Sequence, residues 1–133
     1  MYRVDFPVEE QVVGYIHGRK RAFLQKSHDH RGTPLEPGRV CTLLPAATES
    51  VCWGVAYKVE AGRESEVKAL LDYREKDGYS IEFINVHGKH GVLPNVMVYV
   101  GVSTNPSFAG DSSLEDTARV IARAVGPSGS NRD

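Results

Sequence analysis

The sequence predicts an α+β fold: a small, mostly antiparallel β-barrel with flanking helices. Several short runs are rich in β-branched and aromatic residues and are separated by turn signals, as in antiparallel strands. Two segments carry the 3.6-residue apolar period of a helix. The order is several strands, a helix, two strands and a helix, which is typical of an α+β domain whose sheet can curl into a barrel.

Four strands are predicted in the first half of the chain, over residues 12–18, 21–25, 40–45 and 51–59. The polar segment 27–39, which holds two prolines and two glycines, is predicted to be a long loop. The link between the third and fourth runs is short enough for an antiparallel hairpin, so we expect these two strands to pair. Because the runs are apolar on both faces, we also expect both faces of the sheet to be covered.

A helix is predicted in the middle of the chain, with Gly78 as its stop. Its first turn carries Glu64 and Glu66, and the helix dipole favours negative charge at that end. The residues that share its apolar face, at i, i+3, i+4 and i+7, are Val67, Leu70, Leu71 and Arg74. Two further strands are predicted over 79–86 and 95–103, joined by a turn.

The last predicted helix begins at Ser112, because Ser112 and Glu115 have the spacing of a capping box. Gly126 and Pro127 are expected to end it. One apolar face of this helix is expected to contain Leu114, Ala118, Ile121 and Val125.

Length and composition limit the classes of protein to which the chain can belong. The chain has 133 residues, the size of one domain, so residues 1–133 are expected to form a single domain. A formal net charge of −1 gives no field that would attract nucleic acid or an anionic membrane. No apolar run approaches the roughly 18 residues needed to span a bilayer. We therefore expect neither a nucleic-acid partner nor a membrane partner.

The two cysteines, Cys41 and Cys52, lie in strand-like runs. A disulfide between them would require those strands to pair, and a cytosolic chain would keep them reduced. They do not have the Cys-x-x-Cys spacing of a redox or zinc site. We expect two semi-buried thiols.

Two polar clusters are weaker candidates for function. His28 and His30, with Asp29 between them, could ligate a metal, but the other histidines show no ligand spacing. A polar loop held by side chain–backbone hydrogen bonds is therefore favoured. The basic run from Arg19 to Arg21 could bind RNA, which would predict steeply salt-dependent binding. A solvated turn is favoured because the whole chain is slightly acidic.

Glu75 is the carboxylate that stands out. It lies in "ALLDYREKDGY", residues 69–79, where a helical pattern stops and a strand pattern begins. Negative charge at a helix C-terminus opposes the helix dipole, yet three carboxylates crowd there, Asp72, Glu75 and Asp77. Such a glutamate is usually a solvated surface charge, but a local rule that is broken also points to function.

Six segments occur in an order and spacing that resemble a known family. They are "DHRGTPLEPGRVCTL", "CWGVAYKV", "EVKALLDYREKDGY", "NPSFAG", "LEDTARVIA" and "GPSGSNRD". Together they resemble the ChaC branch of the γ-glutamylcyclotransferases, the glutathione-specific branch, over nearly the whole chain. The resemblance implies a barrel-like α+β enzyme that splits glutathione into 5-oxoproline and cysteinylglycine. It also implies a cytosolic location and no metal or organic cofactor, and we expect a monomer.

The resemblance also implies site residues. The family's catalytic glutamate lies in a "D-[YF]-R-E" segment, which "DYRE" matches here, so Glu75 would be the general acid/base. It would accept a proton from the γ-glutamyl amine and hand it to the leaving amide nitrogen. Glu66 matches a family glutamate near the pocket entrance. Arg31 and Tyr79 complete the substrate-binding residues that we expect.

Two departures from the family pattern bear on activity. Family members open with a strand and a "GYGSL" loop whose backbone grips the γ-glutamyl group, upstream of the segment matched by "YRVDFP". They also continue past "NRD" into a further helix. Neither segment is found in this sequence, which we expect to be truncated at both ends, with an exposed sheet edge. The alternative to an active cyclotransferase is a catalytically inactive family member that acts, if at all, as a binding or regulatory protein.

Overall fold

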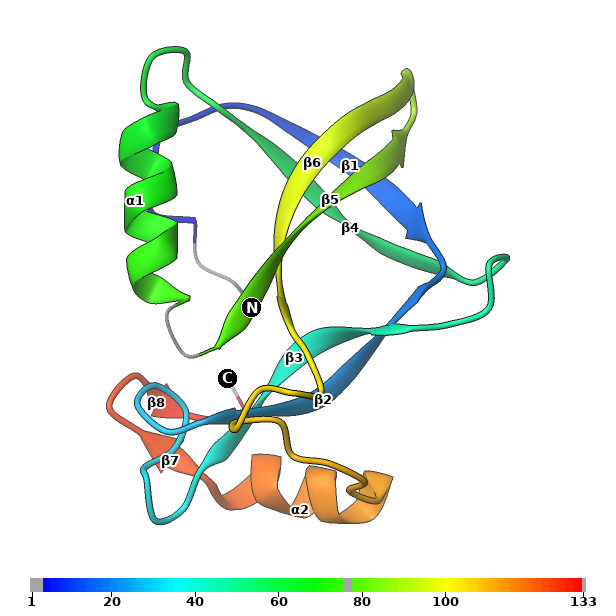
Figure 1. The fold of residues 1–133 in the computed structure, drawn as a ribbon. Helices are drawn as coiled ribbons and strands as arrows, with labels where there is room; N and C mark the ends of the chain where they lie inside the picture. The colour runs from blue at the N-terminus through cyan, green and yellow to red at the C-terminus, as the bar shows by residue number, and fades with distance from the viewer. Residues whose placement is uncertain (1–3, 76–77, 133) are drawn as a thin grey trace. The chain divides into compact units, whose positions relative to one another are not determined.

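The computed structural model describes residues 4–75 and 78–132, which contain eight strands and two helices (Figure 1). The helices are α1 (Glu64–Arg74) and α2 (Leu114–Arg123). The strands are β1 (Val8–His17), β2 (Arg19–Ser27), β3 (Gly38–Pro45), β4 (Val51–Val59), β5 (Tyr79–Gly88), β6 (Gly91–Gly101), β7 (Val125–Gly126) and β8 (Gly129–Ser130).

The chain forms two compact units. The described residues up to Lys20, together with Pro45–Val100, form the first unit, which contains β1, β4, α1, β5 and most of β6. The second unit is formed by Arg21–Leu44 and the residues from Gly101 onward, and it contains most of β2 and β3, α2, β7 and β8. The expectation of a single domain remains a prediction.

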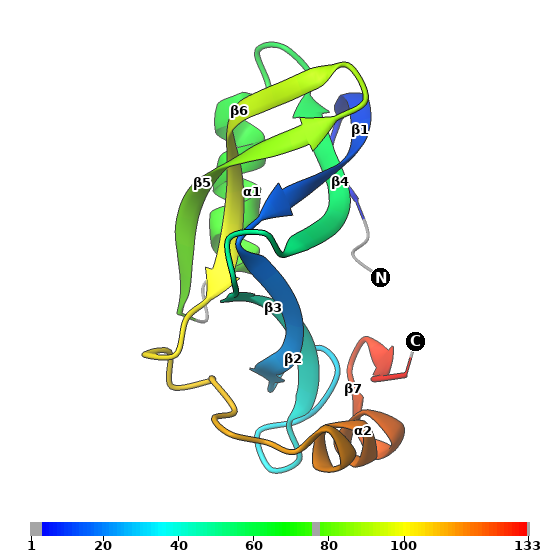
Figure 2. The ribbon, with the colours of Figure 1, turned by 90° about the vertical axis from the view of Figure 1, so that its right-hand side faces the viewer.

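Strand pairing in the described residues gives open sheets. The first unit has a four-stranded sheet in the order β4-β1-β5-β6, while β2 pairs with β3 and β7 with β8. The long β1–β4 ladder is antiparallel, and the two strands lie side by side in Figures 1 and 2. The α+β class and the mostly antiparallel pairing are therefore confirmed, but no closed barrel is found in the described part of the chain.

The predicted hairpin between β3 and β4 is wrong, because β4 pairs with β1 and β3 pairs with β2. Gly18, with a φ of 66°, allows a sharp change of direction between β1 and β2. Its backbone N–H donates to the Ser50 carbonyl at 2.9 Å, and its carbonyl accepts from the Ala46 N–H at 2.9 Å. These bonds join the β1–β2 connection to the β3–β4 connection. Strand β1 therefore pairs with β4, and β2 with β3, while the two strands joined by each connection do not pair with each other.

The sheet of the first unit buries one face and leaves much of the other open. Its buried apolar residues are Ile16, Val67, Val86 and Val100. On the opposite face of β1 and β4, Val13 is 65% exposed and Trp53 is 56% exposed. The expectation that both faces would be covered is therefore wrong for these strands.

Helix α1 confirms the predicted middle helix. It begins at Glu64, ends at Arg74 and buries Val67, and Gly78 follows with a φ of 80°.

The basic run from Arg19 to Arg21, which was predicted to lie at a turn, instead lies in β2. Arg19 is paired with Glu82 of β5 at 2.5 Å.

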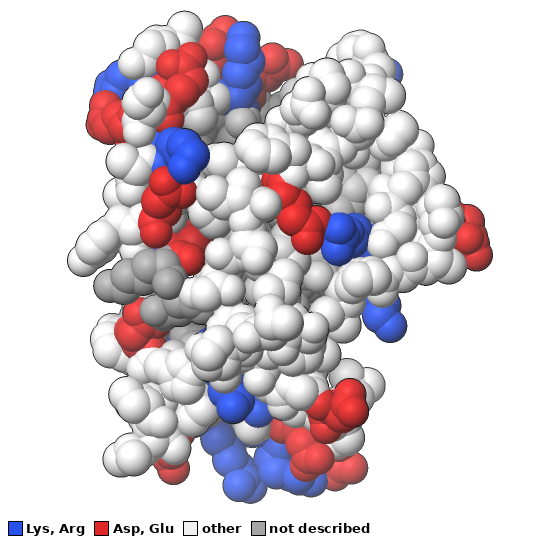
Figure 3. Space-filling model, viewed as in Figure 1, with Lys and Arg blue, Asp and Glu red and all other residues white. Residues whose placement is uncertain are grey.

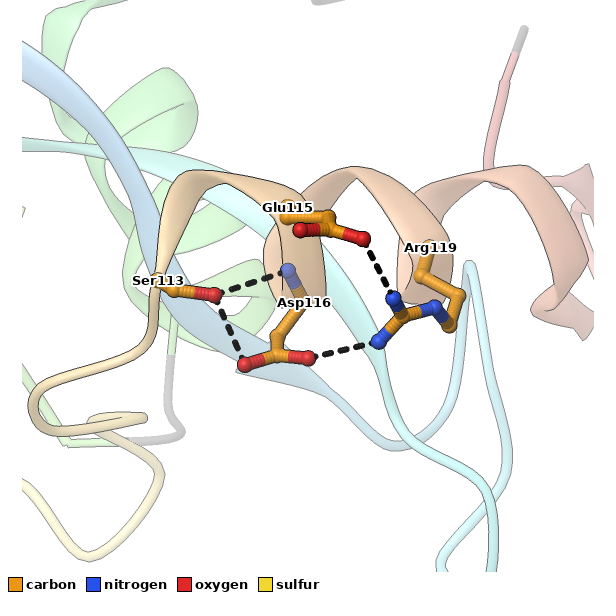
Figure 4. A network of polar contacts seen from close by, with 4 residues as sticks. All are labelled: Ser113, Glu115, Asp116 and Arg119. Atoms are coloured by element: carbon orange, nitrogen blue, oxygen red, sulfur yellow. Dashed lines mark hydrogen bonds and ion pairs between the residues drawn. The ribbon is translucent and has the colours of Figure 1, made fainter.

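Helix α2 begins one capping position later than predicted. Ser113, and not Ser112, is the N-cap residue, and its hydroxyl accepts a hydrogen bond from the Asp116 N–H at 3.0 Å (Figure 4). Ser113 and Asp116 have the same three-residue spacing as the predicted pair. The sequence pattern therefore found the right kind of cap at the wrong serine.

The predicted apolar face of α2 is right for Ile121, which is half-buried, and wrong for Leu114, Ala118 and Val125, which are exposed. The buried stripe contains Thr117 and Ala124, each one position before the predicted Ala118 and Val125. Leu114 is 87% exposed. The buried side of the helix therefore includes Ile121 but is otherwise shifted toward the positions one residue earlier.

The second unit buries mostly polar side chains, among them Gln25, Ser27, Thr42, Asn105 and Thr117. The Thr42 hydroxyl donates to the Gly101 carbonyl and accepts from the Gly101 N–H, both at 2.9 Å. Buried polar atoms of this kind must be bonded, because leaving them unpaired costs free energy. The bonds of Thr42 meet this requirement, whereas the side-chain oxygen and nitrogen of Gln25 are buried and have no hydrogen-bond partner among the described residues.

The two cysteines lie on strands that do not pair with each other. Cys52 on β4 is half-buried, as predicted, whereas Cys41 on β3 is exposed, so the prediction of a semi-buried thiol is wrong for Cys41. Both are thiols.

Charged side chains of both signs are mixed at the surface. Figure 3 shows Lys and Arg next to Asp and Glu around α1 and again around α2, while the surface over β5 and β6 is mostly uncharged. Within residues 4–75 and 78–132, neither helix has the length and apolar character needed to cross a membrane.

Candidate active site

Glu75 lies at the C-terminal end of α1. It is the C-cap residue of the helix, and its backbone N–H donates to the Leu71 carbonyl at 2.8 Å. The residue is half-buried. Asp77, which was predicted to crowd this end, lies outside the described residues. A half-buried carboxylate at a helix end can exchange protons with a bound ligand.

Two long-range contacts hold the last turn of α1. The Arg74 guanidinium donates to the Asp5 carboxylate at 2.5 Å. The Tyr99 hydroxyl, from β6, donates to the Asp72 carboxylate at 2.5 Å, and the Lys68 ammonium donates to the same carboxylate at 2.6 Å. The bonds from Lys68 and then Tyr99 hold the pKa of the Asp72 carboxyl below its ordinary value. The helix turn that leads into the candidate catalytic residue is thus fixed from two sides.

No sequence pattern pointed to Asp5 or Tyr99 as neighbours of this helix end. Asp5 and its partner are 69 residues apart, and Tyr99 and its partner are 27 residues apart. Spacing rules relate residues within one element, so contacts between elements at such separations leave no local signal.

Glu66 lies in the first turn of α1, at the opposite end of the helix from Glu75. Nine residues separate them, which is about 13 Å along a helix axis. The Glu66 carboxylate accepts hydrogen bonds from Arg63 Nε at 2.6 Å and Nη2 at 2.8 Å. These bonds hold the pKa of the Glu66 carboxyl below its ordinary value. The structure does not bring the two glutamates together, and substrate binding by Glu66 remains a prediction.

Tyr79 is the first residue of β5 and is half-buried. It follows Glu75 by four positions in the same unit, so the two residues flank the connection from α1 to β5. Substrate binding by Tyr79 remains a prediction.

Arg31 belongs to the second unit, in the loop between β2 and β3. Its guanidinium donates to the backbone carbonyls of Ser128 at 3.1 Å and Ser130 at 2.9 Å. Its backbone N–H donates to the Ser27 hydroxyl at 3.0 Å. These bonds tie the loop to the β7–β8 hairpin, which is a structural role, and substrate binding by Arg31 remains a prediction.

Close backbone packing joins the same loop and hairpin. The Asn131 side chain accepts from the Arg39 N–H at 2.6 Å and donates to the Arg39 carbonyl at 2.8 Å. A Cβ atom on Gly126 would lie 2.2 Å from the His30 carbonyl oxygen, so the backbones approach where only glycine fits. The segments "DHRGTPLEPGRVCTL" and "GPSGSNRD" therefore belong to one structural cluster.

The "HDHR" segment forms a polar loop, as favoured from the sequence. One side chain–backbone hydrogen bond, from the Arg31 N–H to the Ser27 hydroxyl, holds it, and His30 Nδ1 lies 2.8 Å from the Asp29 carboxylate. Across the described ranges, no group of three or more His, Cys, Asp or Glu side chains is placed to hold a metal ion.

Comparison with known proteins gives consistent matches over the whole chain. A family model described as ChaC-like protein matches residues 1–133. Gamma-glutamylcyclotransferase 2-3 of Arabidopsis thaliana is 40% identical, over 100% of this chain and 70% of that protein. The glutathione-specific gamma-glutamylcyclotransferase of Schizosaccharomyces pombe is 35% identical, over 88% of this chain and 66% of that protein. The chain thus spans about two-thirds of the length of these relatives.

The fold is also that of a solved enzyme. A crystal structure of the selenomethionine-labelled gamma-glutamyl cyclotransferase specific to glutathione from yeast superposes with a TM-score of 0.86. It is 32% identical over 93% of this chain and 74% of that chain. A second crystal structure of the yeast protein has a TM-score of 0.80 at 30% identity, over 94% of this chain and 76% of that chain. On these matches of sequence and fold, the chain belongs to the ChaC-like protein family.

Proposed function

We propose that this chain is a glutathione-specific γ-glutamylcyclotransferase that cleaves glutathione into 5-oxoproline and cysteinylglycine, with Glu75 as its general acid/base. Relatives that carry this name, from S. pombe and from yeast, support the reaction. The observation that carries the role of Glu75 is its position as a half-buried C-cap residue of α1, within the "DYRE" segment.

The proposed reaction is an internal displacement. The α-amino nitrogen of the γ-glutamyl group attacks its own γ-carbonyl carbon, so a C–N bond closes a five-membered ring. The amide bond to the cysteine nitrogen breaks, and no other reactant is consumed. At neutral pH the attacking amine is protonated, so it must lose a proton before it can attack. Glu75 accepts that proton and delivers one to the leaving nitrogen.

Positioning supplies much of the remaining rate. Because the ring closure is intramolecular, a substrate held in a folded conformation reacts with an effective molarity on the order of 10⁵ M or more in favourable systems. The ion pair of Arg74 with Asp5 and the bond of Tyr99 to Asp72 support a fixed approach of the carboxylate. Backbone N–H groups, which the family resemblance assigns to the "GYGSL" loop, would stabilise the oxyanion.

The test is release of 5-oxoproline from glutathione by the purified chain and by Glu75→Gln. We expect the variant to lose about 10²–10⁴-fold in kcat, the usual contribution of a general acid/base. Glu64→Gln is the matched control, an exposed glutamate in the first turn of the same helix, and it should retain most of the turnover. Circular dichroism establishes that each variant is folded. Parental turnover in Glu75→Gln would contradict the assignment.

A lengthened version of the chain tests whether this chain is an active enzyme or an inactive family member. This version carries an N-terminal extension with the family's "GYGSL" strand and is assayed beside the chain itself. Turnover by both supports the proposed function. Turnover by the extended version alone assigns the inactive alternative to this chain. Turnover by neither, in folded protein, contradicts the glutathione reaction, and other γ-glutamyl peptides then become the substrates to assay.

The remaining parts of the proposal follow from the reaction. Proton transfer and ring closure call for no metal or organic cofactor. A cytosolic monomer with glutathione as its small-molecule substrate is the form that we propose, and size-exclusion chromatography tests the oligomeric state.

A further inference from the structure

His17 and His87 lie next to each other on the sheet of the first unit, although they are 70 positions apart in the sequence. Tyr15 of β1 is paired directly with His87 of β5, and His17 is two positions further along β1, on the same face. The centroids of the two imidazole rings are 4.9 Å apart, with 81° between their planes. His17 is exposed and His87 is half-buried, so the pair can be reached from solvent.

This spacing is that of two imidazoles bound to one metal ion. With metal–nitrogen bonds of about 2.0–2.1 Å and tetrahedral angles, two ligating imidazoles have ring centroids roughly 5 Å apart. Each ring turns about its Cβ–Cγ bond, which is a soft torsion, so one nitrogen of each ring can be aimed at a shared point. The strands themselves do not need to move.

We propose that His17 and His87 form a cross-strand binding site for a divalent transition-metal ion of the class of Cu²⁺ and Zn²⁺. Neutral imidazole is a preferred ligand of these ions. The protein supplies two nitrogen ligands, and water or an exogenous ligand fills the other positions, since the described residues contain no cluster of three metal-ligating side chains. The site uses none of the residues assigned to the cyclotransferase reaction, and the proposal does not depend on that reaction.

Tyr15 orders both rings of the site. It is stacked on His87, with centroids 5.2 Å apart and 13° between the planes, and it meets His17 edge-on at 5.3 Å. The rival interpretation is a cluster of rings that only pack against one another, and the experiment must separate the two.

A bound ion would bridge β1 and β5. The recorded register joins β1 to β5 through two residue pairs, Gly14 with Gly88 and Tyr15 with His87. The ladder between β1 and β4 instead runs from Val8 to His17 on β1. An ion that binds the folded chain raises its stability by mass action, so the melting temperature should rise with metal concentration.

The single tryptophan provides a specific reporter. Trp53 is the only tryptophan in the sequence, and its ring centroid lies 5.1 Å from that of Tyr15, which contacts both histidines. A Cu²⁺ ion at the site would therefore quench tryptophan fluorescence in a saturable, one-to-one titration. His17→Asn and His87→Asn should each weaken the binding by more than about 10-fold, since even changes to supporting residues cost 10–100-fold.

Control variants keep the test specific. His28→Asn and His30→Asn alter the other histidine pair and should leave the quenching unchanged. A Zn²⁺ thermal-shift titration gives a second readout, in which the parent and both controls are stabilised and His17→Asn and His87→Asn are not. Because His17 is exposed, His17→Asn also serves alone if His87→Asn does not fold. Parental Cu²⁺ affinity in His17→Asn would overturn the site, and so would loss of binding in His28→Asn.

Discussion

Helices α1 and α2 have nearly the same length, eleven and ten residues, but their ends are held by different kinds of contact. Helix α2 begins at a side-chain cap, Ser113, and its Arg119 is bonded to two carboxylates of the first turn (Figure 4). It runs directly into a hairpin whose backbone packs against a loop. Helix α1 has no side-chain cap hydrogen bond at Arg63, and side chains distant in the sequence hold its last turn.

The difference separates a helix held within its own unit by local caps from the helix that carries the proposed catalytic glutamate. The ends of α2 are fixed by caps and by backbone contacts within its own unit, so its residues serve the packing there. The end of α1 is fixed by Asp5 and Tyr99, which act on the turn before Glu75 and not on the carboxylate itself. Four changes to the protein or its solution test this contrast, in order of decreasing expected effect.

Gly126→Ala should have the largest effect on stability. The new Cβ atom would lie 2.2 Å from the His30 carbonyl oxygen and 2.5 Å from the Gly32 nitrogen, and both are backbone atoms that cannot turn away. We expect the free energy of unfolding to fall by about 3 kcal/mol, measured by urea denaturation. Gly54→Ala is the control, because nothing lies within 4 Å of its added Cβ. Equal urea midpoints for the two variants would contradict the close packing of the loop and hairpin.

Arg31→Ala should destabilise the second unit less strongly. It removes the charged donor of two hydrogen bonds to backbone carbonyls, so we expect a loss of about 2 kcal/mol in the free energy of unfolding. The exposed Arg132, changed to alanine, should cost much less. If Arg31 instead binds substrate, the variant would keep its stability and show a raised KM for glutathione. Thermal or urea unfolding, combined with steady-state kinetics, distinguishes the two roles.

Ser113→Ala tests the cap of α2. Loss of the hydroxyl leaves the Asp116 N–H without its cap acceptor, which should lower the free energy of unfolding by about 1 kcal/mol. Ser112→Ala, at the serine that the sequence pattern favoured, should have little effect. Urea denaturation measures the free energy of unfolding of both variants. A larger loss for Ser112→Ala than for Ser113→Ala would support the predicted capping box instead.

Acidification should weaken both helices by a small amount. The pKa of Asp72 is lowered by the bond from Lys68 and then by that from Tyr99, and the pKa of Asp116 is lowered chiefly by the bond from Ser113. Because the unfolded chain binds protons more tightly at these carboxyls, their contribution to stability is present above the unfolded pKa of about 3.9. It is lost as the pH falls through their folded values.

The measurement is the urea midpoint between pH 7 and pH 2.5. Tyr99→Phe removes one donor to Asp72 and should reduce the pH dependence at the acidic end. Tyr57→Phe keeps its ring contact with Phe6, and its urea midpoint should show the same pH dependence as that of the unchanged chain. A rise in stability on acidification below about pH 4 would contradict the lowered pKa values.

Local patterns in the sequence predicted most of the elements and the position of the proposed catalytic glutamate on them. The period of Val67, Leu70 and Leu71 placed α1, and alternation of β-branched and aromatic residues placed the strands, because both patterns follow from local backbone geometry. The "DYRE" segment put Glu75 at the end of that helix, where the structure has it. The ordered segments also identified the family, since they depend only on residue type and spacing.

How these elements meet depends on tertiary contacts. The pairing of β4 with β1, the orientation of α2 and the bonds that hold the last turn of α1 join residues far apart in the chain, for which local periodicity carries no information. The same is true of His17 and His87, which strand pairing brings within 4.9 Å although their sequence spacing matches no metal motif. Local propensity selects helix or strand, but partners and facing surfaces depend on which arrangement buries and bonds the whole chain best.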